Sequence, residues 1–196
     1  MAVGVVMEFD GGTLEQYDDV IRRMGLTPKG DAPAGALFHW SAATADGIRV
    51  TDVWESQEQF ERFAAAEIGP HTVAAGIPGP PRTQFAQAHS YLTAGEGSGG
   101  GEGTVAVIVE FDGATLDQYD AAIASVGLSS GGPGSPGCLF HWTQATDGGF
   151  RVTDVWSDQS AFEAYAASHI MPAAASAGLT TAPRIEFLPV HSYFTS

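Results

Sequence analysis

The sequence has little cysteine, little positive charge and no long apolar run. Its 196 residues include one cysteine, Cys138, so no internal disulfide can form and nothing indicates an oxidising compartment. Eight lysines and arginines stand against 23 acidic residues, a net charge of −15, which argues against nucleic acid and anionic membrane surfaces as partners. No apolar run approaches the ~18 residues of a membrane-spanning helix, and the start lacks the basic region of a signal peptide. We therefore expect a cytoplasmic protein.

A duplication organises the sequence. Residues 3–93, copy one, align without a gap to residues 105–195, copy two, at a constant offset of 102, and roughly half of the positions are identical. Between the copies lies a run of glycine, serine and glutamate that cannot form a core and is typical of a flexible linker. The expected organisation is a first domain at 1–94, a linker at 95–103 and a second domain at 104–196.

Each copy predicts the order β-α-β-β-α-β. In copy one, Thr13 and Gln16 form a capping box before a helix with one apolar face, and Asp46-Gly47 marks the turn of a hairpin. A second helix starts after Ser56, and Pro70 should kink or end it. The expected strands are 3–9, 36–44, 48–54 and a single last strand at 83–93.

This order is the split βαβ arrangement of ferredoxin-like domains, an α+β fold. The helices of such a domain cover one face of its sheet and leave the other bare. The second strand carries apolar residues on both faces, with Leu37 on one and Phe38 and Trp40 on the other. Two tandem domains can therefore bury their bare faces against each other as an internal pseudo-dimer, which leaves further oligomerisation open.

The order of elements and the run RVTDVWESQEQFERFAAAEIGP at residues 49–70 resemble the dimeric α/β-barrel superfamily, which includes the antibiotic-biosynthesis monooxygenase-like domains. The resemblance covers nearly all of both copies. It implies that the two domains pair as an intramolecular dimeric α/β barrel. Members of this superfamily act as cofactor-free monooxygenases, polyketide cyclases, isomerases, haem-degrading enzymes or binders, so the fold alone does not select a chemistry.

Polar residues on the strands are the candidates for chemistry. By alternation, His39 points away from Phe38 and Trp40, and Asp52 shares a face with Trp54. We expect these two, with Glu8, His89 and Tyr91, to project from one small sheet; the counterparts in copy two are His141, Asp154, Glu110, His191 and Tyr193. A histidine beside a carboxylate or a phenol could serve as a general base, and the alternative is a purely structural hydrogen bond.

Aromatic and basic residues are candidates for binding. The tryptophans, Trp40, Trp54, Trp142 and Trp156, fit either the core or the wall of a pocket for a flat ligand. Tyr17 and Tyr119 lie on helix faces from which their hydroxyls could reach that pocket. Arg82 and Arg184 could bind a substrate anion or a surface carboxylate. Because the usual metal, dinucleotide and phosphate motifs are missing, we expect neither a metal nor a cofactor.

The leading hypothesis is a cofactor-independent, monooxygenase-like enzyme of secondary metabolism. It would act on an aromatic or polyketide-like molecule held between sheet and helices, with catalytic residues His39, His89, His141, His191, Asp52 and Asp154. One alternative is a polyketide cyclase or isomerase that uses a histidine base, and another is a non-catalytic protein that binds a hydrophobic small molecule. Because Glu67 becomes His169 and His71 becomes Ala173 between the copies, we also hypothesise that one pocket kept an ancestral role while the other drifted.

Overall fold

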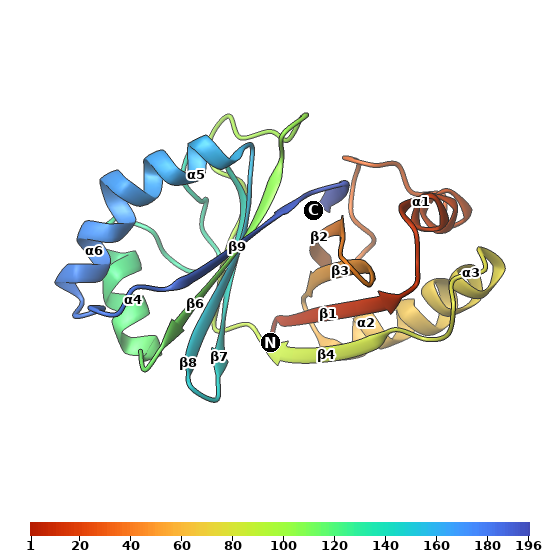
Figure 1. Ribbon diagram of the computed structural model, residues 1–196, viewed down its shortest axis with the longest axis horizontal. Coiled ribbons are helices and arrows are strands. Elements are labelled where there is room, and N and C mark those ends of the chain that lie inside the picture. Colours follow the sequence, from red (N-terminus) through yellow and green to blue (C-terminus); the bar gives the residue numbers. More distant parts are fainter. The chain divides into compact units, whose positions relative to one another are not determined.

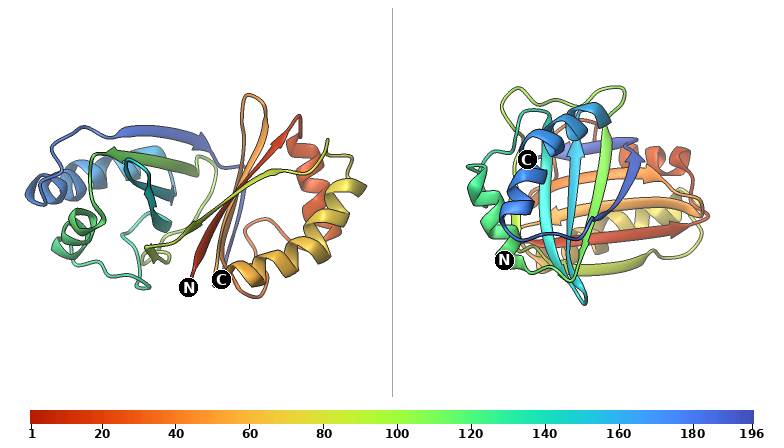
Figure 2. Two further views of the ribbon diagram at one scale, coloured as in Figure 1. Left: turned by 90° about the horizontal axis from the view of Figure 1, so that it is seen from below. Right: turned by 60° about the vertical axis from the view of Figure 1, so that its left-hand side comes forward.

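The computed structural model describes residues 1–196, which form two compact units. Unit 1 contains Met1–Gln87 together with Val190–Ser196, and unit 2 contains Ala88–Pro189. Each unit has one five-stranded antiparallel sheet, with its helices on one face of that sheet (Figures 1 and 2). The expected α+β class is confirmed.

The elements of unit 1 follow the predicted order. They are β1 (Val3–Asp10), α1 (Leu14–Arg23), β2 (Ala36–Ala43), β3 (Gly47–Trp54), α2 (Gln57–Phe63), η1 (Ala64–Ile68), α3 (Gly69–Ala74) and β4 (Arg82–Gln87). The sheet is completed by β10 (Ser192–Thr195), and its strand order is β10-β2-β3-β1-β4.

Unit 2 repeats the same series of elements. They are β5 (Ser90–Leu92), β6 (Val105–Asp112), α4 (Leu116–Ser125), β7 (Cys138–Thr146), β8 (Gly149–Trp156), α5 (Gln159–Tyr165), η2 (Ala166–Ile170), α6 (Met171–Ser176) and β9 (Arg184–Pro189). The strand order is β5-β7-β8-β6-β9, which matches the order in unit 1.

The last strand of each copy differs from the prediction. It is not one strand: β4 ends at Gln87, the chain passes through Ala88 and His89, and β5 then pairs with β7 of unit 2. In the same way β9 pairs within unit 2, whereas β10 pairs with β2 of unit 1. Each copy therefore contributes its final short strand to the sheet that holds the hairpin of the other copy.

Local sequence signals predicted where the first helix begins but not where the second one ends. The Thr13 hydroxyl accepts a hydrogen bond from the Gln16 backbone N–H, and the Thr13 backbone N–H donates one to the Gln16 side chain, so the predicted capping box is confirmed. The second helix does not end at Pro70, because α2, η1 and α3 follow each other without a break. Pro70 lacks an N–H donor, and the π-helical turn η1 just before it changes the hydrogen-bonding pattern at that point.

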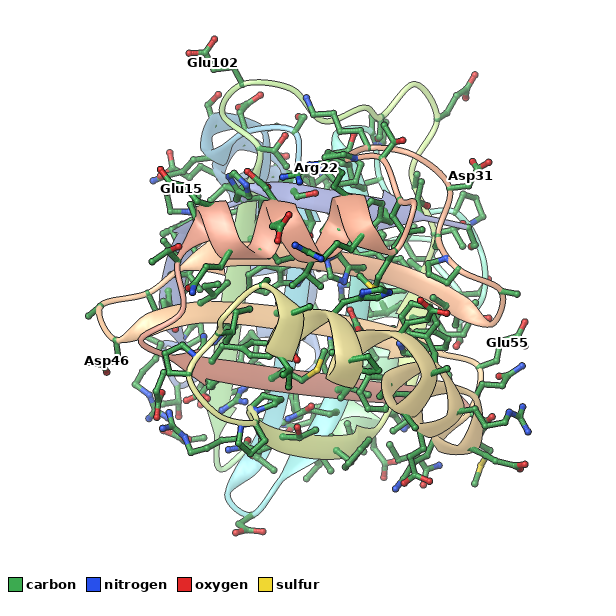
Figure 3. The ribbon with its side chains drawn as sticks, turned by 90° about the vertical axis from the view of Figure 1, so that its right-hand side faces the viewer. Glu15, Arg22, Asp31, Asp46, Glu55 and Glu102 are labelled. Carbon is green, nitrogen blue, oxygen red and sulfur yellow. The ribbon has the colours of Figure 1, made fainter.

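The core of unit 1 lies between the sheet and its helices. Figure 3 looks onto α1 and the α2–η1–α3 helix, which pass in front of the strands, and α1 presents Glu15 and Arg22 to the outside. The opposite side of α1 packs Tyr17, Val20 and Ile21 against the inward side chains of β1 and β3. This layer between sheet and helices is where the polar strand residues must be sought.

The glycine-rich segment between the copies lies in unit 2. Gly95 donates a backbone hydrogen bond to Cys138 O at 2.9 Å, and Gly137 donates to Ser98 Oγ at 2.8 Å. A Cβ atom on Gly95 would lie 2.0 Å from Ser135 O, so this close approach requires glycine. The segment expected at 95–103 thus makes specific contacts at its start.

The longest purely α-helical elements, α1 and α4, have 10 residues each, and the continuous α2–η1–α3 helix runs from Gln57 to Ala74. No helix of the chain has both the length and the apolar character that crossing a membrane requires.

Candidate active site

A buried cluster of tyrosine, histidine and aspartate lies under the helices of unit 1. His39 on β2 is directly opposite Asp52 on β3 in the antiparallel register. Its Nδ1 atom lies 2.6 Å from Asp52 Oδ1, and its Nε2 atom lies 2.7 Å from the Tyr17 hydroxyl on α1. The second carboxylate oxygen of Asp52 accepts a hydrogen bond from Trp54 Nε1 at 3.3 Å. The sequence-predicted pair of His39 and Asp52 is therefore brought into contact.

Unit 2 holds the same cluster at nearly the same distances. His141 Nδ1 lies 2.6 Å from Asp154 Oδ1, and His141 Nε2 lies 2.7 Å from the Tyr119 hydroxyl. A further group, Thr143 Oγ1, lies 3.2 Å from His141 Nε2. In contrast to Trp54, the buried Nε1 atom of Trp156 has no hydrogen-bond partner.

The environment of His141 favours its charged form. Burial alone lowers the pKa of His141, but the negative charge of its neighbours and its hydrogen bonds to Asp154 and Tyr119 outweigh burial and raise the pKa to about 10. This shift favours the imidazolium form, in which Nδ1 donates to Asp154 and Nε2 donates to Tyr119. A resting general base, the role expected for these histidines, requires the neutral ring, so this geometry favours a cationic role for His141.

A large cavity adjoins the cluster in unit 2. Its volume is about 550 Å³, and both His141 and Asp154 lie on its wall. Most of the remaining wall is apolar, with Trp156, Phe162 and Ile123 among the lining residues. This volume is within the range of pockets that bind drug-sized molecules.

The corresponding cavity in unit 1 is much smaller. Its volume is about 50 Å³, although Tyr17, His39 and Asp52 all lie on its wall. Such a space admits water-sized molecules but no aromatic ring system. The two units thus share a polar cluster and differ in the room beside it.

Side-chain exchanges between the copies explain part of this difference. Six residues that line the small cavity have smaller counterparts at the equivalent positions of unit 2: Met7 with Val109, Val20 with Ala122, Met24 with Val126, Pro33 with Ser135, Thr72 with Ala174, and Phe194 with Leu92. Three exchanges act in the opposite direction: Ala36 with Cys138, Ile48 with Phe150, and Phe63 with Tyr165. The larger cavity also extends to the loop from Thr180 to Pro183. The smaller cavity does not reach the equivalent loop of unit 1.

His89 and His191 do not join the sheets in which they were expected. His89 lies in unit 2, where its Nε2 atom pairs with Asp120 Oδ1 at 2.8 Å and its ring meets Tyr119 edge-on. His191 lies in unit 1 and pairs with Asp18 Oδ1 at 2.7 Å. The expectation that His39 and His89 share one sheet is wrong, because the chain leaves the first sheet at Ala88.

The other candidate residues divide between the cavity wall and the rest of the sheet. Trp54 and Trp156 line the cavities. The residues that point from the opposite sheet face or lie at strand ends are Trp40, Trp142, Tyr91, Tyr193, Arg82, Arg184, Glu8 and Glu110. Glu8 and Arg49 form a cross-strand ion pair at 2.6 Å, so Arg49 and Asp52 have different partners.

Surface ion pairs account for the arginines that were candidates for substrate binding. Arg82 pairs with Asp10, and Arg184 pairs with Asp112 and Glu110, in both cases with an exposed guanidinium. Hydrogen bonds from Arg184 and Arg151 hold the pKa of the Glu110 carboxyl below its usual range. Neither Arg82 nor Arg184 lines the cavity beside a histidine cluster.

Sequence reasoning missed several wall residues of the large cavity, chiefly Leu92, Ile170, Met171, Thr180, Thr181 and Ile185. A position-by-position comparison of the copies would have singled out part of this set, because Leu92, Met171 and Ile185 differ in size from their counterparts Phe194, Gly69 and Thr83. Cys138 also lies on the wall, where burial raises the pKa of its thiol. No three histidine, cysteine or acidic side chains are grouped so that they could hold a metal ion.

Comparisons with known proteins show the fold. No protein-family model and no curated protein sequence matches the chain. A provisionally assigned monooxygenase from Fusobacterium nucleatum has a similar structure, with a TM-score of 0.70 and 10% identity over 100% of this chain and 94% of that one. Another from Lactobacillus acidophilus NCFM has a TM-score of 0.67 and 11% identity over 99% of this chain and 95% of that one. At these identities the likeness establishes a shared fold.

Proposed function

We propose that the chain is a cofactor-independent, monooxygenase-like enzyme whose reaction takes place in the cavity of unit 2. The observation that carries this proposal is the His141–Asp154–Tyr119 cluster, whose His141 and Asp154 lie on the wall of a mostly apolar cavity of about 550 Å³. The substrate is an electron-rich aromatic or polyketide-like molecule with an acidic C–H or O–H group. The fold shared with two proteins named as monooxygenases agrees with this chemistry.

The cation at His141 suits a substrate that reacts as its anion. A phenol or an anthrone that loses a proton to water leaves a delocalised anion, which an imidazolium in an apolar cavity stabilises strongly. This anion supplies electrons to O₂ and forms a carbon–oxygen bond, and the resulting peroxide anion takes a proton back from water as a hydroperoxide. Loss of water from the carbon that carries both H and OOH then gives C=O, so that one O₂ yields one ketone oxygen and one water and the substrate provides all the electrons.

Asp154 and Tyr119 act on the substrate through His141. Asp154 holds the ring orientation and its charge, since it accepts from Nδ1 at 2.6 Å. Tyr119 accepts from Nε2, and its own O–H stays available as a donor. The three side chains come from β7, β8 and α4, so the rigid part of the fold positions them.

The test is oxygen uptake with anthrone and a panel of naphthols as substrates. We expect His141→Gln to lower the rate at least about 100-fold, because it removes the cation while keeping most of the side-chain volume. The matched control is His39→Gln in unit 1, which should leave the rate within about twofold of wild type because its cavity holds no substrate. Thermal unfolding of both variants checks that each remains folded.

Equal losses in the two variants would contradict the assignment of the reaction to unit 2. A cyclase or isomerase is the second candidate, because an imidazolium stabilises an enolate equally well. That enzyme would turn over a polyketone without oxygen, so the same assay under nitrogen separates the two reactions. Binding with no turnover in either atmosphere would leave a non-catalytic binding protein.

A further inference from the structure

The large cavity crosses the whole sheet of unit 2. Its wall includes residues from all five strands, represented in sheet order by Leu92, His141, Asp154, Val109 and Ile185. Neighbouring strands lie about 4.8 Å apart, so the four intervals between them span about 19 Å. The small cavity of unit 1 reaches four of its strands and no residue of β4.

One end of the cavity is open to solvent and apolar. Met171 on α6 and Ile185 on β9 line the cavity and are nevertheless 66% and 47% exposed, which places its mouth between these two elements. Exposed large hydrophobic side chains are few in this protein. The equivalent positions of copy one are Gly69 and Thr83, which provide no apolar rim.

The other end of the cavity is closed by a residue from copy one. Leu92 on the edge strand β5 is 1% exposed and lines the cavity at the end opposite Ile185. The equivalent residue in unit 1 is the larger Phe194, whose ring centre lies 4.8 Å from that of His39. In unit 1, therefore, a phenyl ring occupies the space beside the histidine that remains open in unit 2.

We infer that the ligand of unit 2 is an elongated, flat and largely apolar molecule of about three fused rings, which enters between Met171 and Ile185 and extends to Leu92. Its middle then lies beside His141 and Asp154, where the proposed reaction takes place. Leu92 determines the length of ligand that is accepted, and Met171 and Ile185 determine how fast it enters. This inference rests on the proposed function for the identity of the reacting centre, but it concerns binding, which can be measured without turnover.

The experiment compares two probes, 2-naphthol with two rings and 2-hydroxyanthraquinone, which is already a quinone, with three. Binding is measured by quenching of tryptophan fluorescence, under nitrogen for the naphthol. Leu92→Phe introduces the residue of the other copy and should weaken binding of the three-ring probe about 10-fold, while the two-ring probe changes less than about threefold. Val109→Met, a second variant that fills space in the middle of the cavity, should weaken binding of both probes. It controls for a folding defect specific to position 92.

Rim variants test the mouth. Met171→Ser and Ile185→Thr should slow association of the three-ring probe in stopped-flow measurements, whereas Val73→Ser is a matched control on an exposed helix residue of unit 1, 78% exposed and outside both cavities. Equal effects of Leu92→Phe on both probes, or no effect on either, would overturn the inference. Length-selective binding without oxygen uptake would defeat only the proposed function, and oxygen uptake without length selectivity would defeat only this inference.

Discussion

Unit 1 and unit 2 present the same tyrosine–histidine–aspartate cluster, with every distance equal within 0.1 Å, beside cavities of about 50 and 550 Å³. Since the cluster persists where no ligand fits, its hydrogen bonds also serve the fold, in which they satisfy buried polar groups between sheet and helix. The cluster alone therefore does not identify a site. The proposed site rests on the cluster together with the space beside it, which unit 2 has and unit 1 lacks.

Each cavity depends on residues from both copies. The closed end of each cavity is formed by the short strand that the other copy contributes, with Phe194 in unit 1 and Leu92 in unit 2. A substitution near the end of one copy therefore acts on the cavity whose cluster belongs to the other. This arrangement lets two domains of nearly equal sequence diverge through a few side chains.

The largest expected effect comes from exchanging the wall residues between units. The variant Leu92→Phe, Val109→Met, Ala174→Thr gives unit 2 the side chains of unit 1 and should weaken binding of 2-hydroxyanthraquinone about 100-fold, because the added atoms occupy ligand space. The reciprocal variant Phe194→Leu, Met7→Val, Thr72→Ala should open unit 1 and add a second, weaker binding site. Calorimetric titration measures both the affinity and the number of sites per chain.

The opened variant should also be less stable, because each shortened core side chain loses packing worth about 1 kcal/mol. Thermal unfolding without ligand measures this cost. If the filled unit 2 bound the probe as tightly as wild type, cavity volume would not be what distinguishes the units.

A smaller effect is expected from pH. The folded-state pKa of His141 is raised from 6.5 to about 10, so the stability gained from its charged form is complete below pH 6.5 and is lost as the pH rises through about 10. Burial also raises the pKa of Tyr17, whose contribution is lost only above its ordinary value of 10.0. Unfolding temperatures between pH 7 and 10 should fall by about 4 °C or more in wild type.

In His141→Gln the fall in unfolding temperature between pH 7 and 10 should be largely absent. Above pH 10 the unfolding temperature should still fall as in wild type, because Tyr17 is intact. A decline of the same size in His141→Gln would show that another group titrates in this range. The matched variant His39→Gln controls for the loss of a buried histidine from the equivalent position.

Local sequence signals predicted much of the fold and the centre of the site. The capping box at Thr13, the hairpin around Gly47 and the cross-strand pair of His39 and Asp52 follow from spacing and alternation alone. These features depend on neighbours in the chain or on one hairpin, whose register the turn determines. The pairing of the two units as an α/β barrel stays a prediction.

The exchange of the last strands and the size of the cavities could not be predicted in the same way. Both β2 and β7 contain LFHW, so the edges that β5 and β10 join are almost identical, and no local preference selects one of them. One signal was present: Pro189 at the end of β9 marks the break of the last strand in copy two, although its counterpart is Gln87. Cavity volume depends on how closely helix and sheet approach, which no spacing in the sequence records.

The smallest expected effect concerns the ion pairs beside the exchanged strands, His191 with Asp18 in unit 1 and His89 with Asp120 in unit 2. Their N–O distances are 2.7 and 2.8 Å, and all four side chains are 30% to 55% exposed. Double-mutant cycles with alanine should therefore give coupling energies of about 0.2–1 kcal/mol, similar in the two units and reduced by salt. A much larger coupling in one unit would show that its strand depends on this pair, and the exchange would then be asymmetric. Equal, small couplings would instead show that the exchanged strands are stabilised in both units by their pairing with the sheet and not by these ion pairs.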